Sequence, residues 1–434
     1  MLPRIAVGNH LTPIDALFMS ASAVCVTGLA VIDVANKLSF LGQIVLLLLV
    51  QLGGLGIMTF TGFFGFYLSG RSSYKTQVMF AELMDEKKLG SVIYLLTRVV
   101  MLTFLFELLG AVLIYFSTDT SNFSTRSEHV FFALFHSVSS FCNAGFSTLS
   151  AGLFDETTRF NYTLQLIIAA LYILGGLGFA IILNIRMYFM RRLNRLIDRF
   201  WHKKPVKYKP WILSFNSKII IYTTVILLVF GFAAFFVLEY DHSLAEHPTF
   251  YGKVVTAFFA GSTPRTAGYN TVDMTTLSLP VVLIIMLLMW IGGSPGSTAG
   301  GIRTTTIAVA TLNIINTGRN SDRMNLFRRE ISNESIRKAF AIIALSLVWL
   351  AIAISGLSFT DGSQSLIALA FESFSAFSTV GLTLGLTSSL SDGGKILIVI
   401  TMFVGRVGTL TLLVALMKNR RERRYQYPEE QVLF

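Results

Sequence analysis

The sequence predicts an all-α integral membrane protein, and its composition and hydropathy carry that prediction. Hydrophobic residues make up 53% of the 434-residue chain and charged residues only 14%, whereas a soluble domain carries about 25% charged residues. Several apolar runs also exceed the roughly 18 residues that indicate a spanning helix. We expect spans near 40–68, 91–116, 163–190, 217–238, 279–317 (interrupted), 337–357 and 395–417. These spans leave no room for a large soluble domain.

Charge is distributed unevenly along the chain, whose net charge is +11. Lysine and arginine cluster in segments 71–88, 191–210, 318–338 and 418–424. Cytoplasmic segments of membrane proteins are enriched in these residues, so we expect all four inside the cell. Nucleic-acid binding is disfavoured because the basic segments flank spanning helices. The outer face then carries Asp119, Glu128, Asp155, Glu156, Asp241, Glu246, Asp361 and Asp392, and an acidic face concentrates cations.

Four segments of the chain resemble one another. Each is a short apolar run followed by a tetrapeptide that ends in glycine: "ALFMSASAVCVTGLAVID" (16–33), "ALFHSVSSFCNAGFSTL" (133–149), "AFFAGSTPRTAGYNTVDM" (257–274) and "AFESFSAFSTVGLTLGL" (370–386). The four glycines, Gly28, Gly145, Gly268 and Gly381, are 117, 123 and 113 residues apart. Each run is too short to cross a membrane and turns polar at its end.

A second, glycine-rich mark follows each tetrapeptide at a similar distance. It reads "GGLG" at 53–56 and 175–178, "GGSPG" at 292–296 and "GRVG" at 405–408, and it begins 25, 30, 24 and 24 residues after the tetrapeptide glycine. The two marks in register predict four repeats of helix, half-inserted loop and helix, spanning 1–90, 91–210, 211–334 and 335–434. The last repeat includes the basic C-terminus. Repeat one begins almost at its loop, so we expect its first helix to be missing from this chain.

Irregular backbone at membrane depth is tolerated only where it is buried in protein or lines a water-filled cavity. We therefore expect the four short runs to be pore helices that point their negative C-terminal ends at one axis related by pseudo-fourfold symmetry. The tetrapeptides would offer backbone carbonyls, which can replace the hydration shell of potassium, and their glycines would supply backbone freedom. The expected lining is Cys25, Val26, Thr27 and Gly28; Cys142, Asn143, Ala144 and Gly145; Arg265, Thr266, Ala267 and Gly268; and Ser378, Thr379, Val380 and Gly381. The alternative is four helix-breaking glycines in unrelated packing.

These residues resemble the Trk/Ktr/HKT superfamily of cation transporters. "VTGLAVID", "CNAGFS", "RTAGYNTVDM" and "STVGLT" are similar to its four filter segments, and the resemblance covers essentially the whole chain. It is nearest to the bacterial potassium-translocating subunit KtrB. The resemblance implies potassium uptake across the bacterial cell membrane, often promoted by sodium, by a homodimer with one pore per subunit. It also implies a cytoplasmic RCK-type nucleotide-binding regulatory subunit.

A sodium-permeable pore or an alternating-access cation carrier is the alternative function. Such carriers usually contain inverted repeats, whereas these four repeats share one orientation, which favours the pore. An enzyme is disfavoured, because His136 stands alone and the sequence has no Ser/His/Asp grouping, HExxH motif or Walker lysine. Cys25 and Cys142 lack metal-ligand spacing. We therefore expect no cofactor and no metal site apart from the transported K+, and the resemblance implies Na+ as an activating ion.

The segment "GGSPGSTAGGIRTTT" (292–306) interrupts the fifth span with five glycines and a proline, so it cannot be one continuous helix. It lacks the Gly-Lys-Ser/Thr ending of a phosphate loop, which disfavours nucleotide binding. The resemblance implies an intramembrane loop that gates the pore, and its glycines are Gly292, Gly293, Gly296, Gly300 and Gly301. The alternative is a passive kink.

Three charged residues lie within predicted membrane segments. A mid-membrane arginine costs about 2.5–3.5 kcal/mol on insertion scales, so Arg406 should have a partner or line a cavity. The resemblance places it below the filter, where it opposes cation flow, and a structural salt bridge is the alternative. Glu372, in the fourth pore helix, is expected to support the filter as a hydrogen-bond acceptor. Glu107 is expected to serve packing or interhelical bonding.

Overall fold

The computed structural model describes residues 11–56, 92–197, 214–319, 324–327, 329–409 and 411, without the side chains of 92–96, 180, 189 and 191–197. The regular secondary structure of the described part is helical, apart from a two-stranded antiparallel sheet of β1 (Asn325–Leu326) and β2 (Arg329–Glu330). Residues 1–10, where the expected missing helix would join the chain, lie outside the described residues.

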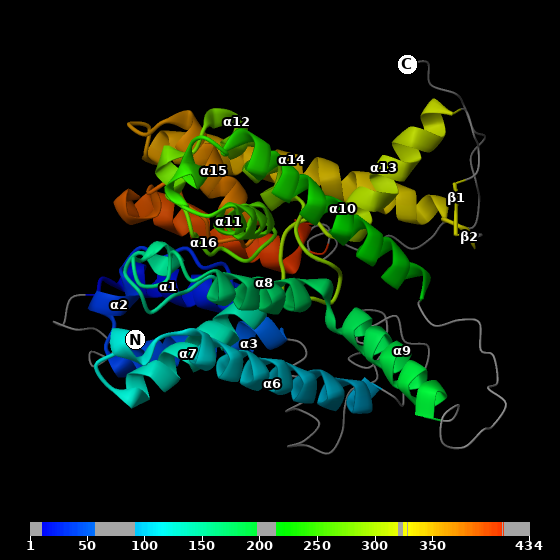
Figure 1. Cartoon of the computed structure of the whole chain (residues 1–434). Helices are drawn as coiled ribbons and strands as arrows, with labels where there is room; N and C mark the ends of the chain where they lie inside the picture. The colour runs from blue at the N-terminus through cyan, green and yellow to red at the C-terminus, as the bar shows by residue number, and fades with distance from the viewer. Residues whose placement is uncertain are drawn as a thin grey trace.

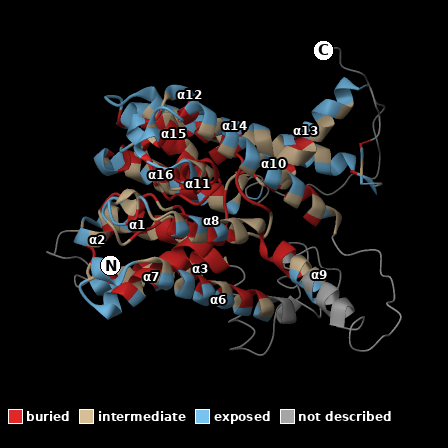
Figure 2. Cartoon of the chain, viewed as in Figure 1, coloured by how far each residue is buried: buried red, intermediate tan, exposed pale blue. Residues whose placement is uncertain are grey.

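Three long helices are long and apolar enough to cross a membrane within the described ranges. They are α6 (Val92–Ser117), α10 (Phe215–Leu238) and α14 (Asn333–Thr360). Their outward faces carry exposed apolar side chains such as Leu108, Val229 and Phe359, the last 91% exposed, and Figure 2 shows these helices outside a buried interior. Apolar side chains that face outward suit contact with lipid hydrocarbon.

A short helix follows each long one, and a fourth stands at the start of the described chain. These are α1 (Pro13–Cys25), α7 (Arg126–Phe141), α11 (Phe250–Ser262) and α15 (Leu366–Phe377). Each begins at a hydroxyl residue, Thr12, Thr125, Thr249 or Ser365, whose side chain accepts a hydrogen bond from the backbone N–H three residues later. Such caps satisfy the N–H groups that a helix start leaves free. Three of the short helices end at or directly before a predicted filter tetrapeptide, and α11 ends two residues before the third one begins at Arg265.

A further helix comes after each tetrapeptide: α3 (Phe40–Leu55), α8 (Tyr162–Leu177), α12 (Leu279–Trp290) and α16 (Asp392–Val407). Three of them end directly before Gly56, Gly178 and Gly408, whose φ angles are +81°, +89° and +93°. The span predicted over 163–190 is bent, because the chain turns by 106° between α8 and α9 (Phe179–Ile197). A positive φ does not continue a right-handed helix.

The expected interruption of the fifth span is present. A non-helical segment over 291–303 separates α12 from α13 (Thr304–Gly318). Arg406 was expected inside a continuous last span; instead it lies in the last turn of α16, next to the helix end at Val407. Residues 57–68 and 412–417 of two other predicted spans lie outside the described residues.

Figure 1 shows the two halves of the chain as adjacent layers, with α1–α8 in one and α10–α16 in the other. The halves are joined through their first and last helices, because one apolar core contains Phe18, Cys25, Val138, Ala376 and Met402. Short elements complete the connections: α2 (Val34–Lys37), η3 (Thr120–Asn122), η4 (Gly152–Phe154), η6 (Ser243–Glu246), η7 (Met274–Thr276) and η8 (Thr387–Ser389). Helices α9 and α13 project from the same end of the molecule (Figure 1).

Candidate functional site

The four tetrapeptides share one backbone conformation despite their different side chains. The second residue of each has a positive φ: Val26 at 57°, Asn143 at 62°, Thr266 at 68° and Thr379 at 50°. The fourth residue of each, Gly28, Gly145, Gly268 or Gly381, also has a positive φ, between 67° and 96°. Valine and threonine rarely adopt this conformation, so the surrounding structure imposes it.

The four segments meet in a closed ring. A Cβ built on any of the four glycines would lie less than 3.0 Å from a carbonyl oxygen of the next segment. The pairs are Gly28 with Ala144, Gly145 with Ala267, Gly268 with Val380, and Gly381 with Thr27. Real Cβ atoms essentially never approach so closely. Each glycine is therefore required by the carbonyl of the next segment, and the fourth segment returns to the first.

Backbone N–H groups near the ends of the tetrapeptides point back to their own short helices. Thr27 donates to Ser22 O at 2.8 Å, Ala144 to Ser139 O at 2.7 Å and Val380 to Ser375 O at 2.9 Å. Among the described residues, the carbonyl oxygens of Thr27, Ala144, Ala267 and Val380 accept no hydrogen bond. The ring thus presents free carbonyl oxygens next to one another.

Side chains of the ring are buried, and several contact surrounding helices. Arg265 donates to the carbonyls of Thr224 and Gly292 at 3.5 and 3.4 Å. The hydroxyls of Thr27, Ser378 and Thr379 are buried without a hydrogen-bond partner among the described residues. Buried hydroxyls normally have a partner, protein or water. Buried hydroxyls without a protein partner beside a carbonyl ring are compatible with a site that binds water or a cation.

The glycine-rich marks hold the short helices in place. A Cβ on the first glycine of three marks, Gly53, Gly175 or Gly405, would lie less than 3.0 Å from the carbonyl oxygen of Val24, Phe141 or Phe377 respectively. These carbonyls stand at the C-terminal ends of α1, α7 and α15. In these three marks the first glycine therefore allows close packing, and the last glycine, Gly56, Gly178 or Gly408, stands directly after the end of the helix.

The glycine-rich segment 291–303 lies against the ring and the neighbouring helix break. Ser294 donates from its N–H to Gly176 O at 3.1 Å and from its hydroxyl to Leu177 O. The Phe179 N–H donates to Gly296 O at 3.2 Å. Gly292 packs against the carbonyl of Gly300, and Gly293 against Ala299. Gly300 packs against the Thr379 hydroxyl and Gly301 against Ser378, so this segment touches the fourth tetrapeptide.

Arginine side chains stabilise this segment. Arg406 donates to the carbonyl oxygens of Thr298 and of Gly53, and Arg303 donates to those of Ser294, at 3.4 Å, and Ala299, at 2.5 Å. Within the described ranges, no carboxylate forms an ion pair with Arg406. The alternative of a structural salt bridge therefore finds no partner there.

Two buried carboxylates support neighbouring segments through hydrogen bonds. Glu372 accepts from the hydroxyls of Thr383, at 2.8 Å, and Thr387, both in the chain that follows the fourth tetrapeptide. Glu107 on α6 accepts from Gln51 Nε2 of α3 at 3.1 Å and from the thiol of Cys142 at 3.7 Å. Glu107 thus bonds between helices and reaches the side chain of a predicted filter residue, a contact for which the sequence offers no signal.

The histidine and the two cysteines considered in the sequence analysis form no catalytic or metal-binding cluster within the described part of the chain. His136 is buried and lies 2.9 Å from both Phe132 O and the Ser147 hydroxyl, which is a structural arrangement. Cys25 and Cys142 are free thiols. No group of three or more His, Cys, Asp or Glu side chains that could hold a metal occurs in the described part of the chain.

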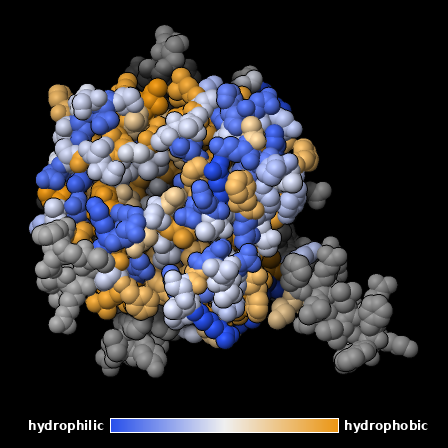
Figure 3. Space-filling view, turned by 60° about the vertical axis from the view of Figure 1, so that its left-hand side comes forward, coloured by the Kyte–Doolittle hydropathy of each residue, from blue (hydrophilic) through white to orange (hydrophobic). Residues whose placement is uncertain are grey.

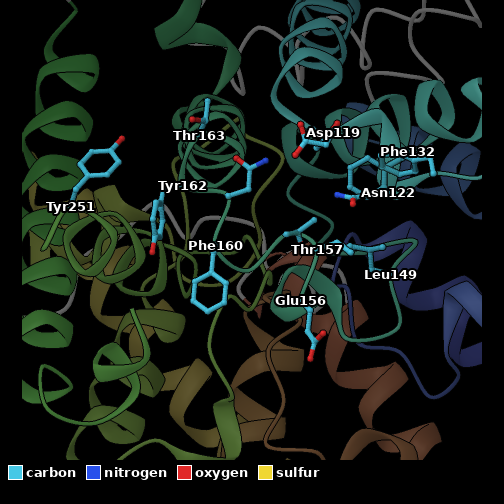
Figure 4. A pocket seen from close by; sticks show the side chains of 14 residues that line it. Asp119, Asn122, Phe132, Leu149, Glu156, Thr157, Phe160, Tyr162, Thr163 and Tyr251 are labelled. Atoms are coloured by element: carbon cyan, nitrogen blue, oxygen red, sulfur yellow. The ribbon is translucent and has the colours of Figure 1, made fainter. Parts of the chain in front are cut away.

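An outer cavity of about 490 Å³ lies apart from the ring and is lined by none of its residues. Figure 4 shows its lining, which includes Asp119, Glu156, Thr157 and Tyr251. Figure 3 shows the face formed by the left-hand side of Figure 1, on which hydrophilic residues are interspersed with hydrophobic ones. Its two acidic residues, Asp119 and Glu156, belong to the segments that the sequence analysis expects on the outer face.

The match to a protein-family model decides the family. Residues 2–425 match the model described as TrkH, cation transport protein. The chain belongs to the TrkH family. The family resemblance and the expectation that the protein is not an enzyme are thereby confirmed, and TrkH-family proteins are multi-pass proteins of the cell membrane.

Curated TrkH-family relatives cover nearly the whole chain. The potassium/sodium uptake protein NtpJ of Enterococcus hirae is 33% identical over 97% of this chain and 89% of its own. The Ktr system potassium uptake protein B of Bacillus subtilis is 34% identical over 100% and 92%. The crystal structure of the potassium transporter TrkH from Vibrio parahaemolyticus superimposes with a TM-score of 0.68 at 18% identity, covering 94% of this chain and 79% of that one. It supports the helical membrane fold.

Proposed function

We propose that this protein takes up potassium through a channel-like pore whose selectivity filter is the ring of four tetrapeptides. The closed series of glycine–carbonyl contacts carries the proposal, because four segments far apart in sequence bring unbonded carbonyl oxygens to one place. Carbonyl rings replace the hydration shell of potassium. The four repeats, 1–90, 91–210, 211–334 and 335–434, are the units that supply one segment each. The relative from Bacillus subtilis is named as a potassium uptake protein and the one from Enterococcus hirae as a potassium/sodium uptake protein, which agrees with this substrate.

Segment 291–303 serves as the gate in this proposal. It lies against the tetrapeptides of repeats two and four and is anchored by hydrogen bonds to the break between α8 and α9. Irregular backbone at this depth needs a polar cavity or protein around it. Arg406 keeps the gate closed in two ways: it holds the Thr298 carbonyl, and its positive charge repels a passing cation.

A regulator moves this gate from the cytoplasmic side. The resemblance supplies its class, an RCK-type nucleotide-binding subunit, and a homodimer with one pore per chain as the assembly. Helices α9 and α13 project together from one end (Figure 1), and basic segments follow both. That end is the surface on which we place the regulator. Sodium acts as an activator, as the resemblance implies.

Uptake of labelled potassium by cells that lack their own potassium uptake systems, with and without sodium, tests the proposed function. Saturable uptake that exceeds sodium uptake supports it, and stimulation by sodium supports the activating role. A sodium-permeable pore would show equal or greater uptake of sodium. An alternating-access carrier would show a fixed coupling stoichiometry between the two ions, which a pore does not.

A further inference from the structure

Asn143 is the second residue of its filter tetrapeptide, and it is the one whose side chain connects three segments. Its amide Nδ2 donates to the Thr266 hydroxyl at 3.2 Å, in the neighbouring tetrapeptide. Its Oδ1 accepts from the Thr298 hydroxyl at 3.1 Å, in the gate segment. Asn143 is 1% exposed and Thr298 is 1% exposed. Both bonds are therefore shielded from bulk water.

The backbone fixes this side chain in place. Asn143 has φ = +62°, a conformation that asparagine adopts more readily than β-branched residues do. The equivalent positions hold Val26, Thr266 and Thr379. Valine cannot form either bond, and threonine is too short to bridge two partners in this way. Asparagine at this position thus serves the bridge as well as the backbone.

Thr298 is the point at which the gate and the filter meet. Its carbonyl accepts from Arg406, whereas its hydroxyl donates to Asn143. A displacement of segment 291–303 that separates Thr298 from Arg406 moves the hydroxyl with it. The Asn143 side chain then loses one of its two anchors, and the other anchor is Thr266 of the filter.

We propose that Asn143 and Thr298 form a coupling pair that makes the ion preference of the filter depend on the position of the gate. With the gate closed, the pair fixes the second and third tetrapeptides in one geometry. With the gate displaced, Asn143 is released and those tetrapeptides tolerate a wider range of ions. The inference rests on the proposed function, because it concerns the same filter and gate, and it makes Asn143 a positioning residue.

Thr298→Val tests the pair, because it removes the hydroxyl and keeps the carbonyl that Arg406 contacts. The measurement is uptake of labelled rubidium by proteoliposomes containing the purified full-length protein, with Na+ as competitor. In this proposal ions load the filter while the gate is closed, so we expect Na+ to compete roughly three- to tenfold better than in the parent, the range set by the loss of one buried hydrogen bond. Thr298→Ser retains the hydroxyl and should restore the parent ratio.

Thr256→Val is the matched control. Thr256 is fully buried, and its hydroxyl donates to the amide oxygen of Gln165 at 3.3 Å, between α11 and α8. The control removes the same kind of bond away from the gate, so its rubidium-to-sodium ratio should equal that of the parent. An equal loss of selectivity in this control would show a general effect of helix packing and would overturn the coupling.

The decisive comparison repeats Thr298→Val in an Arg406→Ala background, which leaves no side-chain donor to hold the Thr298 carbonyl. Coupled residues give non-additive effects. Thr298→Val should then change the ratio by less than about twofold, because the bond is already broken. An equal change in both backgrounds, or an unchanged ratio in the parent background, overturns the coupling while leaving the filter in place. Absence of selective rubidium uptake by the unaltered protein would overturn the proposed function itself.

Discussion

Gly381 of the fourth tetrapeptide lies against the carbonyl oxygen of Thr27 of the first, and this contact closes the ring. The two residues belong to opposite ends of the chain, yet a Cβ on Gly381 would collide with that oxygen. The Lys395 ammonium lies 2.7 Å from the Asp15 carboxylate and joins the same two repeats nearer the starts of α16 and α1. The first and last repeats are therefore held together at two levels.

The first prediction concerns the filter glycines. Gly268→Ser and Gly145→Ser should each weaken selectivity for potassium over sodium, because the new Cβ displaces the carbonyl of the next segment. We expect discrimination to fall about tenfold, equivalent to about 1.4 kcal/mol. Competition of sodium against labelled rubidium uptake by purified, folded variants measures it.

Gly385→Ser is the matched control for these variants. Gly385 also has a positive φ, +88°, but a Cβ there would meet only a Thr275 methyl at 3.8 Å. It introduces the same backbone strain away from the ring. Unchanged sodium exclusion in both filter variants would refute the filter assignment, and an equal loss in Gly385→Ser would assign the effect to strain.

The second prediction concerns the gate segment. Shortening 294–301 should raise flux in the absence of a cytoplasmic partner, because it removes the contacts of Ser294 with Gly176 and Leu177 and of Thr298 with Arg406. Ser294→Ala removes the hydroxyl bonds alone and should raise flux less. Rubidium uptake at matched protein amounts measures both. A folded deletion variant with unchanged or lower flux would favour the passive kink.

The third prediction concerns pH and the outer loop. His247 is 2% exposed, and burial, followed by the charges of Arg159 and Lys253, lowers its pKa to about 4. The unfolded chain binds the proton near the ordinary histidine pKa of about 6.5, so protonation favours unfolding. Stability should be fully present above about pH 6.5 and fall as the pH drops toward 4. Thermal unfolding in detergent across this range measures it.

His247→Gln provides the comparison for the pH series. Glutamine does not titrate, so the variant should lose part of the stability difference between pH 7 and pH 4.5, even if its stability at neutral pH is lower. A variant with the same pH dependence as the parent would show that other groups cause the acid destabilisation.

The sequence predicted the ring better than it predicted the helices. The two marks in register located all four tetrapeptides, because the structure requires glycine where each meets the next carbonyl. The same marks gave no warning that α8 would end at Gly178. A glycine inside a helix costs only about 1 kcal/mol relative to alanine, so "GGLG" is compatible with a continuous span. Whether such a glycine breaks the helix depends on what packs against it, here Ser294 and the carbonyls of segment 291–303.

Contacts between polar side chains were less predictable. Glu107, Gln51 and Cys142 come from three parts of the chain, as do Asn143, Thr266 and Thr298. Hydropathy and spacing identify which segments enter the membrane, but they do not say which polar groups face one another there. For the same reason, the sequence did not decide whether Arg406 repels cations or forms a structural salt bridge. Its contacts with two carbonyl oxygens add a third role, which is to hold the gate segment in place.

The last prediction separates these roles of Arg406. A cation that passes a fixed positive charge at about 4–6 Å, with an effective dielectric near 20, meets a barrier of about 3–4 kcal/mol before solvent screening. Arg406→Gln removes this charge and the two-pronged guanidinium that reaches both carbonyls. We predict a higher maximal flux with nearly unchanged apparent potassium affinity, because potassium binds above this position. Concentration-dependent uptake at matched membrane abundance measures both quantities.

Arg406→Lys distinguishes charge from anchoring. Lysine keeps the charge, but its compact ammonium cannot reproduce the planar fork that reaches both Thr298 O and Gly53 O. If repulsion alone closes the pore, Arg406→Lys should conduct like the parent while Arg406→Gln conducts faster. If the carbonyl contacts hold the gate segment, both variants should conduct faster, and Arg406→Lys should retain part of the barrier. Equal or lower maximal flux in both folded variants would show that Arg406 only stabilises the fold, because releasing the gate segment would then have no effect on the path of the ion.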